Sequence, residues 1–166
     1  MYNSAGAQMS PGRKMSLKTL LTAITLCTLL AAAEPDPILG VWKLNLARSR
    51  FNPGPAPRSQ TRTYVETPKG IQVTIRSVGA SGRSSTIEFP ERYDGRDYPV
   101  QGSEVADALA LVRINDYMAE ATMKHGSRVV ATARRLITDE GKTLIINYKE
   151  PSPEHPVDNQ LVYDKQ

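Results

Sequence analysis

Short stretches of alternating side chains are the feature of this sequence that most restricts its possible folds. Ile71, Val73 and Ile75 fall on one side of an extended chain, and Gln72 and Thr74 fall on the other. A period of two is typical of a half-buried β-strand, because successive side chains of a strand point to opposite faces. Clusters of glycine, proline, asparagine and aspartate separate such stretches at a spacing of roughly 8–12 residues. This pattern predicts an all-β chain.

The alternation continues from residue 40 to the C-terminus. We predict strands over 40–45, 61–67, 71–76, 85–89, 93–100, 109–114, 117–124, 127–138, 142–150 and 160–164. Within 93–100 we expect two short strands around a tight Asp94–Gly95 turn. Residues 46–51 can form a helical turn, and residues 105–110 can form one in place of the start of a strand. Proline-rich loops are expected at 52–57 and 151–159.

This number of short strands is typical of an antiparallel sandwich or barrel. Turns of two to five residues favour an up-and-down meander, and closing the meander into a barrel removes both exposed edges. We therefore expect one antiparallel up-and-down β-barrel of about 8–10 strands.

The N-terminal segment has the organisation of an export signal. Its basic residues precede an uncharged apolar run that ends in three alanines, namely Arg13, Lys14 and Lys18 before residues 20–33. We predict a signal peptide over 1–33, cleaved before Glu34, and a single exported domain over 34–166, periplasmic or secreted. The apolar run is shorter than the ~20 residues of a membrane-spanning helix, although a retained N-terminal anchor is the alternative. Met15 is a possible true start of the chain.

Charge and cysteine content exclude several classes of function. The chain has 21 basic and 17 acidic residues, and the predicted leader contains three of the basic ones, which leaves 18 against 17. A net charge of +1 gives no indication of a nucleic-acid partner. The single cysteine, Cys27, lies in the leader. The exported domain therefore has no disulfide, thiol nucleophile or thiolate metal ligand.

Three segments resemble the calycin superfamily, which comprises the lipocalins and the fatty-acid-binding proteins. Residues 40–44, Gly-Val-Trp-Lys-Leu, are similar to the G-x-W motif that begins the first strand of that superfamily. Residues 134–144 resemble its late hairpin, and residues 162–165 resemble its closing strand. The chain also resembles small secreted lipocalin-like bacterial proteins of unassigned role. The resemblance implies a barrel closed at one end by Trp42 and Gly40, around a cavity for a small hydrophobic or amphipathic ligand.

The chain departs from the fatty-acid-binding proteins at its last strand. Those proteins commonly end in Arg-x-Tyr, whose arginine and tyrosine hold a carboxylate, whereas this chain has Leu161, Val162 and Tyr163. The tyrosine is present and the arginine is not. The two-helix lid of that family is also replaced by the proline-rich loop.

Five residues are candidates for ligand binding: Arg113, Arg135, Tyr64, Tyr117 and Tyr163. If the strand face of Arg113 is inward, a guanidinium lies in an apolar lumen and needs an anionic partner. Arg134 and Arg135 are adjacent, so one of them points inward, where it can meet a ligand or pack on Trp42. The tyrosines would suit a partly polar ligand. Ordinary core, rim or surface positions are the alternative for each.

No motif indicates catalysis, a cofactor or a metal. His125 and His155 have no second histidine or carboxylate at ligand spacing, and neither H-E-x-x-H nor G-x-S-x-G occurs. Glu91, Asp94 and Asp97 are expected to be solvated turn acids. The leading prediction is an exported, non-catalytic binding protein for a small, mostly apolar ligand. The alternative is a structural module of the cell envelope with a filled barrel, and an internal cavity of ~300 Å³ or more favours binding.

Overall fold

The computed structural model describes residues 34–166, and the predicted leader, with Met15 and Cys27, lies outside them. Ten strands make up the described chain, and it has no helix that would be long and apolar enough to cross a membrane. The strands are β1 (Gly40–Leu44), β2 (Ser59–Thr67), β3 (Gly70–Val78), β4 (Ser84–Glu91), β5 (Asp94–Pro99), β6 (Ala108–Asn115), β7 (Met118–His125), β8 (Arg128–Thr138), β9 (Thr143–Glu150) and β10 (Val157–Lys165).

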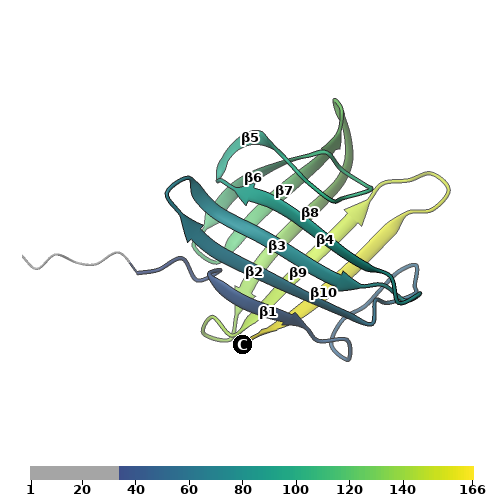
Figure 1. Cartoon of the computed structure of the whole chain (residues 1–166), viewed down its shortest axis with the longest axis horizontal. Helices are drawn as coiled ribbons and strands as arrows, with labels where there is room; N and C mark the ends of the chain where they lie inside the picture. Colours follow the sequence, from purple (N-terminus) through teal and green to yellow (C-terminus); the bar gives the residue numbers. More distant parts are fainter. Residues whose placement is uncertain (1–33) are drawn as a thin grey trace, which may run out of the picture. The chain divides into compact units, whose positions relative to one another are not determined.

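All ten strands belong to one antiparallel sheet in the order β4-β3-β2-β1-β10-β9-β8-β7-β6-β5. Every pair except β1–β10 joins strands that are consecutive in the chain, which makes the sheet an up-and-down meander. The β1–β10 ladder pairs Trp42 with Lys165 and Leu44 with Tyr163, and it brings the two ends of the domain together. The sheet curls into a nearly closed barrel (Figure 1). The predicted fold class is confirmed, and the architecture is calycin-like.

The barrel has one seam, between β4 and β5. Only the residues after β5 return to β4, where Glu88 and Gln101 exchange two backbone hydrogen bonds of 3.0 and 2.9 Å. Gly102 follows with φ +75°, and a Cβ atom there would lie 2.0 Å from the carbonyl oxygen of Thr86. The chain can cross β4 this closely because glycine has no side chain.

Trp42 marks one end of the barrel interior. Its side chain is fully buried, and its Nε1 donates a 2.7 Å hydrogen bond to the carbonyl of Ile38. Gly40 has φ +118°, a conformation that admits the turn between this entry segment and β1. Residues 34–39 therefore cross the barrel end next to the indole, and we refer to this end as the base.

Two local expectations are corrected by the structure. Residues 94–99 are one strand, not two, because β5 pairs with β6 on both sides of an irregularity between Asp94 and Asp97. The extra residue is accommodated as a bulge, with Gly95 at φ +71°. Residues 46–48 form a hydrogen-bonded turn without a helix, and residues 105–107 are extended or bent.

Replacement of Gly102 by alanine is expected to open the seam. The new Cβ would displace the segment from β4, so the free energy of unfolding should fall by about 3 kcal/mol or more, and amide exchange at Glu88 and Gln101 should accelerate. Gly126→Ala is the matched control, because Gly126 also has a positive φ but no atom within 4 Å of the added Cβ. It should cost only about 1–2 kcal/mol. Equal losses in urea unfolding would contradict the expectation.

Candidate ligand-binding site

A cavity of about 370 Å³ lies inside the barrel. Its walls are mainly apolar, and its end away from Trp42 is formed by the proline-rich loop and the segment after β5, including Phe51, Pro55 and Val105. The volume is within the range of ~300–1,000 Å³ that is usual for small-molecule sites. The barrel is therefore not filled by its own side chains.

Small residues on two neighbouring strands create this space. The inward positions of β7 include Ala119 and Ala121, and an inward position of β8 is Ala133. Leucine, isoleucine and phenylalanine line the cavity from the other strands, for example Ile75, Phe89 and Leu109. A barrel of this size is filled when large side chains occupy every inward position. Alanines at consecutive inward positions leave the volume empty.

Arg62 on β2 is the charged group of the cavity wall that forms no ion pair with any residue of 34–166. Its Nε donates a 3.0 Å hydrogen bond to the Tyr163 hydroxyl, and its guanidinium carbon lies 5.3 Å from the centre of the Tyr163 ring. Burial acts to lower the pKa of Arg62, but the neighbouring Tyr163 and Tyr64 hydroxyls act oppositely, and the pKa stays above its ordinary value. The guanidinium is therefore charged at any physiological pH, inside a mainly apolar cavity.

Arg62 was not among the residues predicted from the sequence, although the register explains its position. Arg62 lies opposite Trp42 in the β1–β2 ladder, and Tyr163 lies opposite Leu44 in the β1–β10 ladder. Trp42 and Leu44 point into the barrel, so the side chains paired with them on the two neighbouring strands, Arg62 on β2 and Tyr163 on β10, also point inward. The arginine that contacts Tyr163 therefore comes from β2, and not from the position two residues before Tyr163.

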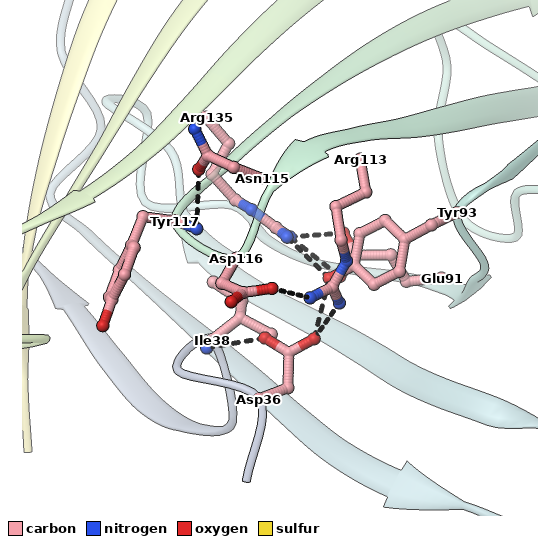
Figure 2. Close-up of polar contacts among 9 residues, drawn as sticks. All are labelled: Asp36, Ile38, Glu91, Tyr93, Arg113, Asn115, Asp116, Tyr117 and Arg135. Carbon is pink, nitrogen blue, oxygen red and sulfur yellow. Dashed lines mark hydrogen bonds and ion pairs between the residues drawn. The ribbon is translucent and has the colours of Figure 1, made fainter. Parts of the chain in front are cut away.

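Arg135 is the inward member of the predicted pair, and Arg134 points outward to Glu120. The Nη1 atom of Arg135 donates to both carboxylate oxygens of Glu91, at 2.7 and 2.8 Å, and its Nη2 donates to the Tyr93 hydroxyl at 2.7 Å (Figure 2). The side chains of Arg135 and Glu91 are only 10% and 3% exposed. Burial acts to lower the pKa of Arg135, but Glu91, Tyr64 and Tyr93 together raise the pKa above its ordinary value, and Glu91 neutralises the charge within the protein.

Arg113 lies at the base and does not line the cavity, which corrects its expected place in the lumen. It pairs with Asp36 of the entry segment, and its guanidinium carbon lies 3.8 Å from the centre of the Tyr93 ring (Figure 2). Its face of β6 is inward, as the alternation predicts, but Arg113 is the last inward residue and lies beyond the cavity end. Its ion pair with Asp36 ties residues 34–39 to the barrel wall.

The three tyrosines of the prediction have different positions. Tyr64 and Tyr163 are buried, and Tyr64 lines the cavity wall. Tyr117 is 54% exposed and points away from the base network in Figure 2, so it does not line the cavity as a predicted ligand-binding residue would. The physical reason is that Tyr117 belongs to the β6–β7 turn, where its backbone nitrogen donates to the side chain of Asn115. Strand β7 and its inward alternation begin only after it.

Among the described residues, no group of three or more histidine, cysteine or carboxylate side chains is arranged to hold a metal ion. His125 forms only an exposed contact with Asp107, at 3.8 Å, and the backbone nitrogen of His155 donates to Ser152 in the second proline-rich loop. The polar chemistry of the interior therefore comes from arginine, tyrosine, glutamine and glutamate side chains.

Comparison with known proteins identifies no family. No family model and no curated protein matches the sequence. Among solved structures, the chain is similar to one described as the siderocalin Ex-FABP, which functions through dual ligand specificities. The match has 11% sequence identity and a TM-score of 0.41, and it covers 78% of this chain and 74% of that one. Nothing about the ligand of this chain follows from a likeness this distant.

The buried Arg135–Glu91 pair should matter far more to stability than its surface neighbour. Glu91→Gln leaves the buried charge of Arg135 uncompensated, so we expect the free energy of unfolding to fall by about 3–5 kcal/mol. Glu120→Gln is the matched control, because Arg134 and Glu120 are 60% and 45% exposed. Its effect should stay below about 1 kcal/mol. Urea unfolding of both variants measures the difference, and similar midpoints would refute it.

Proposed function

We propose that this protein is an exported, non-catalytic binding protein for a small, mostly apolar molecule with one anionic group. The observation that carries the proposal is the uncompensated charge of Arg62 in the wall of an apolar cavity. A guanidinium removed from bulk water is stabilised by an anionic partner, and arginine suits carboxylates because it presents two parallel N–H donors. The other two inward-face arginines, Arg113 and Arg135, already have carboxylate partners.

The remaining walls suit an apolar body. Burial of apolar surface contributes roughly 25 cal/mol per Å², or about 0.8 kcal/mol for each methylene group. The anionic group of the ligand would contact Arg62. The apolar part of the ligand would extend past the alanines of β7 towards the end of the cavity that the proline-rich loop forms. At about 30 Å³ for each water-sized group, the cavity has room for roughly twelve non-hydrogen atoms. A carboxylic acid with ten carbons is of this size.

The geometry favours binding over the alternatives. The pKa of Arg62 lies above its already high ordinary value, which makes it a poor proton donor or acceptor near neutral pH. A structural module with a filled barrel would have neither a cavity of about 370 Å³ nor the unpaired guanidinium of Arg62 in its wall. We therefore favour a container for a ligand over an enzyme or a filled scaffold.

Decanoate and decanol are suitable probes, because they differ mainly in the charged group. We expect the described domain to bind decanoate more tightly than decanol in isothermal titration calorimetry. Arg62→Gln should weaken decanoate binding by about 10–100-fold, since a hydrogen bond to a charged group contributes ~1.5–3 kcal/mol, and it should leave decanol binding unchanged. Ala121→Leu should weaken both ligands by filling the cavity. Equal losses for the two ligands in Arg62→Gln would contradict the role of its charge.

Export is tested on the protein from its own source. We expect cleavage before Glu34, so that the intact mass corresponds to residues 34–166, and native mass spectrometry should retain the additional mass of a small molecule. A mass that includes residues 1–33 would contradict removal of the leader. A ligand-free spectrum from the source, together with no binding of either probe, would contradict the binding function.

A further inference from the structure

A chain of side-chain hydrogen bonds leads from the barrel wall to Arg62. The Gln60 amide nitrogen donates to Ser77 Oγ at 2.7 Å, and the Gln60 carbonyl oxygen accepts a short hydrogen bond from the Tyr163 hydroxyl. The Tyr163 oxygen in turn accepts from Nε of Arg62 at 3.0 Å. Gln60 lies opposite Ser77 in the β2–β3 ladder and two residues before Arg62, so strand register places all the members of the chain.

The chemistry of the groups fixes the direction of this chain. A guanidinium only donates, and an amide carbonyl only accepts. Burial raises the pKa of Tyr163, and Arg62 offsets this only in part, so the hydroxyl stays protonated. Its single proton is directed to Gln60, while one of its lone pairs accepts from Arg62. Tyr163 consequently has no proton left for a ligand.

This series of hydrogen bonds occupies the Nε side of the Arg62 guanidinium. Nε of Arg62 is engaged by Tyr163, and the Tyr64 hydroxyl also lies near the guanidinium, but the Nη groups form no ion pair within residues 34–166. The Tyr163 ring lies near the guanidinium carbon, at 5.3 Å from the ring centre. An arginine held at Nε presents its Nη groups with less loss of rotational freedom when a ligand binds.

We infer that Gln60 and Tyr163 are positioning residues that hold Arg62 for the ligand, and that the anionic group of the ligand meets the Nη groups of Arg62 but receives no proton from Tyr163. This inference rests on the proposed function. It differs from what the calycin resemblance implies, in which the tyrosine near the end of the last strand holds the carboxylate together with an arginine. Here the tyrosine acts through Arg62, and specificity depends on Gln60, whose amide groups are already engaged by Tyr163 and Ser77.

Gln60→Met distinguishes a Tyr163 that positions Arg62 from a Tyr163 that binds the ligand directly. The variant removes the hydrogen-bond acceptor of the Tyr163 hydroxyl and so frees its proton for a ligand. If Gln60 positions Arg62, the variant should weaken decanoate binding about 3–10-fold and leave decanol binding unchanged. Tyr163→Phe should do the same, and the double variant should lose no more than Tyr163→Phe alone, because both act in one chain. Gln160→Met, at an exposed glutamine on β10, is the control and should change neither ligand.

A readout without ligand distinguishes failure of the inference from failure of the proposed function. In ¹H–¹⁵N spectra of the free protein, the Arg62 Nε–H should exchange slowly in the wild type and at least tenfold faster in both Gln60→Met and Tyr163→Phe. If the wild type binds neither probe, the proposed function fails. The exchange rate of the Arg62 Nε–H then shows by itself whether Gln60 and Tyr163 position Arg62. Unchanged Arg62 exchange in Gln60→Met, unchanged or tighter decanoate binding in that variant, or additive losses in the double variant would each overturn it.

Discussion

An arginine inside a small barrel needs a partner for its charge, and this requirement organises the interior of the molecule. The inward faces of β2, β6 and β8 each carry one arginine, namely Arg62, Arg113 and Arg135. Glu91 at the end of β4 neutralises Arg135, and Asp36 from the entry segment pairs with Arg113. Removing one member of the buried Arg135–Glu91 pair costs several kcal/mol, and the partly exposed Arg113–Asp36 pair adds a second contact between distant parts of the chain. Arg62 has no carboxylate partner among residues 34–166, so it is the unpaired cation of a cavity wall that also includes Arg135 and Glu91.

The base and the cavity thus have different physical roles. At the base, Tyr93 connects the two ion pairs, since its hydroxyl contacts Arg135 and its ring lies against Arg113. A network of this kind makes the interior rigid and specifies one packing, although the buried Nε of Arg135 has no hydrogen-bond partner within residues 34–166. Above the base, the small side chains of the alanines on β7 and β8 leave an empty volume where larger side chains would pack against one another. The cost of that space is a less completely packed core.

The fold could be predicted from the sequence because most strands have one clearly apolar face. Ile71, Val73 and Ile75 identify the inward face of β3 without any knowledge of its neighbours. Strand β2 has no such face. Its inward residues include Arg62 and Tyr64, while the aliphatic Val65 points outward and is 54% exposed. Hydrophobic alternation therefore indicates the wrong face here, and only the register with Trp42 on β1 reveals that Arg62 is internal.

The candidate site shows a more general limit of reading motifs along one strand. A motif such as Arg-x-Tyr tests neighbours two residues apart, because side chains at that spacing share a face. A barrel also brings side chains together across strands, at sequence separations that no local pattern encodes. Arg62 and Tyr163 are separated by the width of β1, and the short ladders of β1 with β2 and β10 decide that they meet. The last strand carries no arginine two residues before Tyr163, but the interior still contains an arginine–tyrosine pair, since β2 provides the arginine.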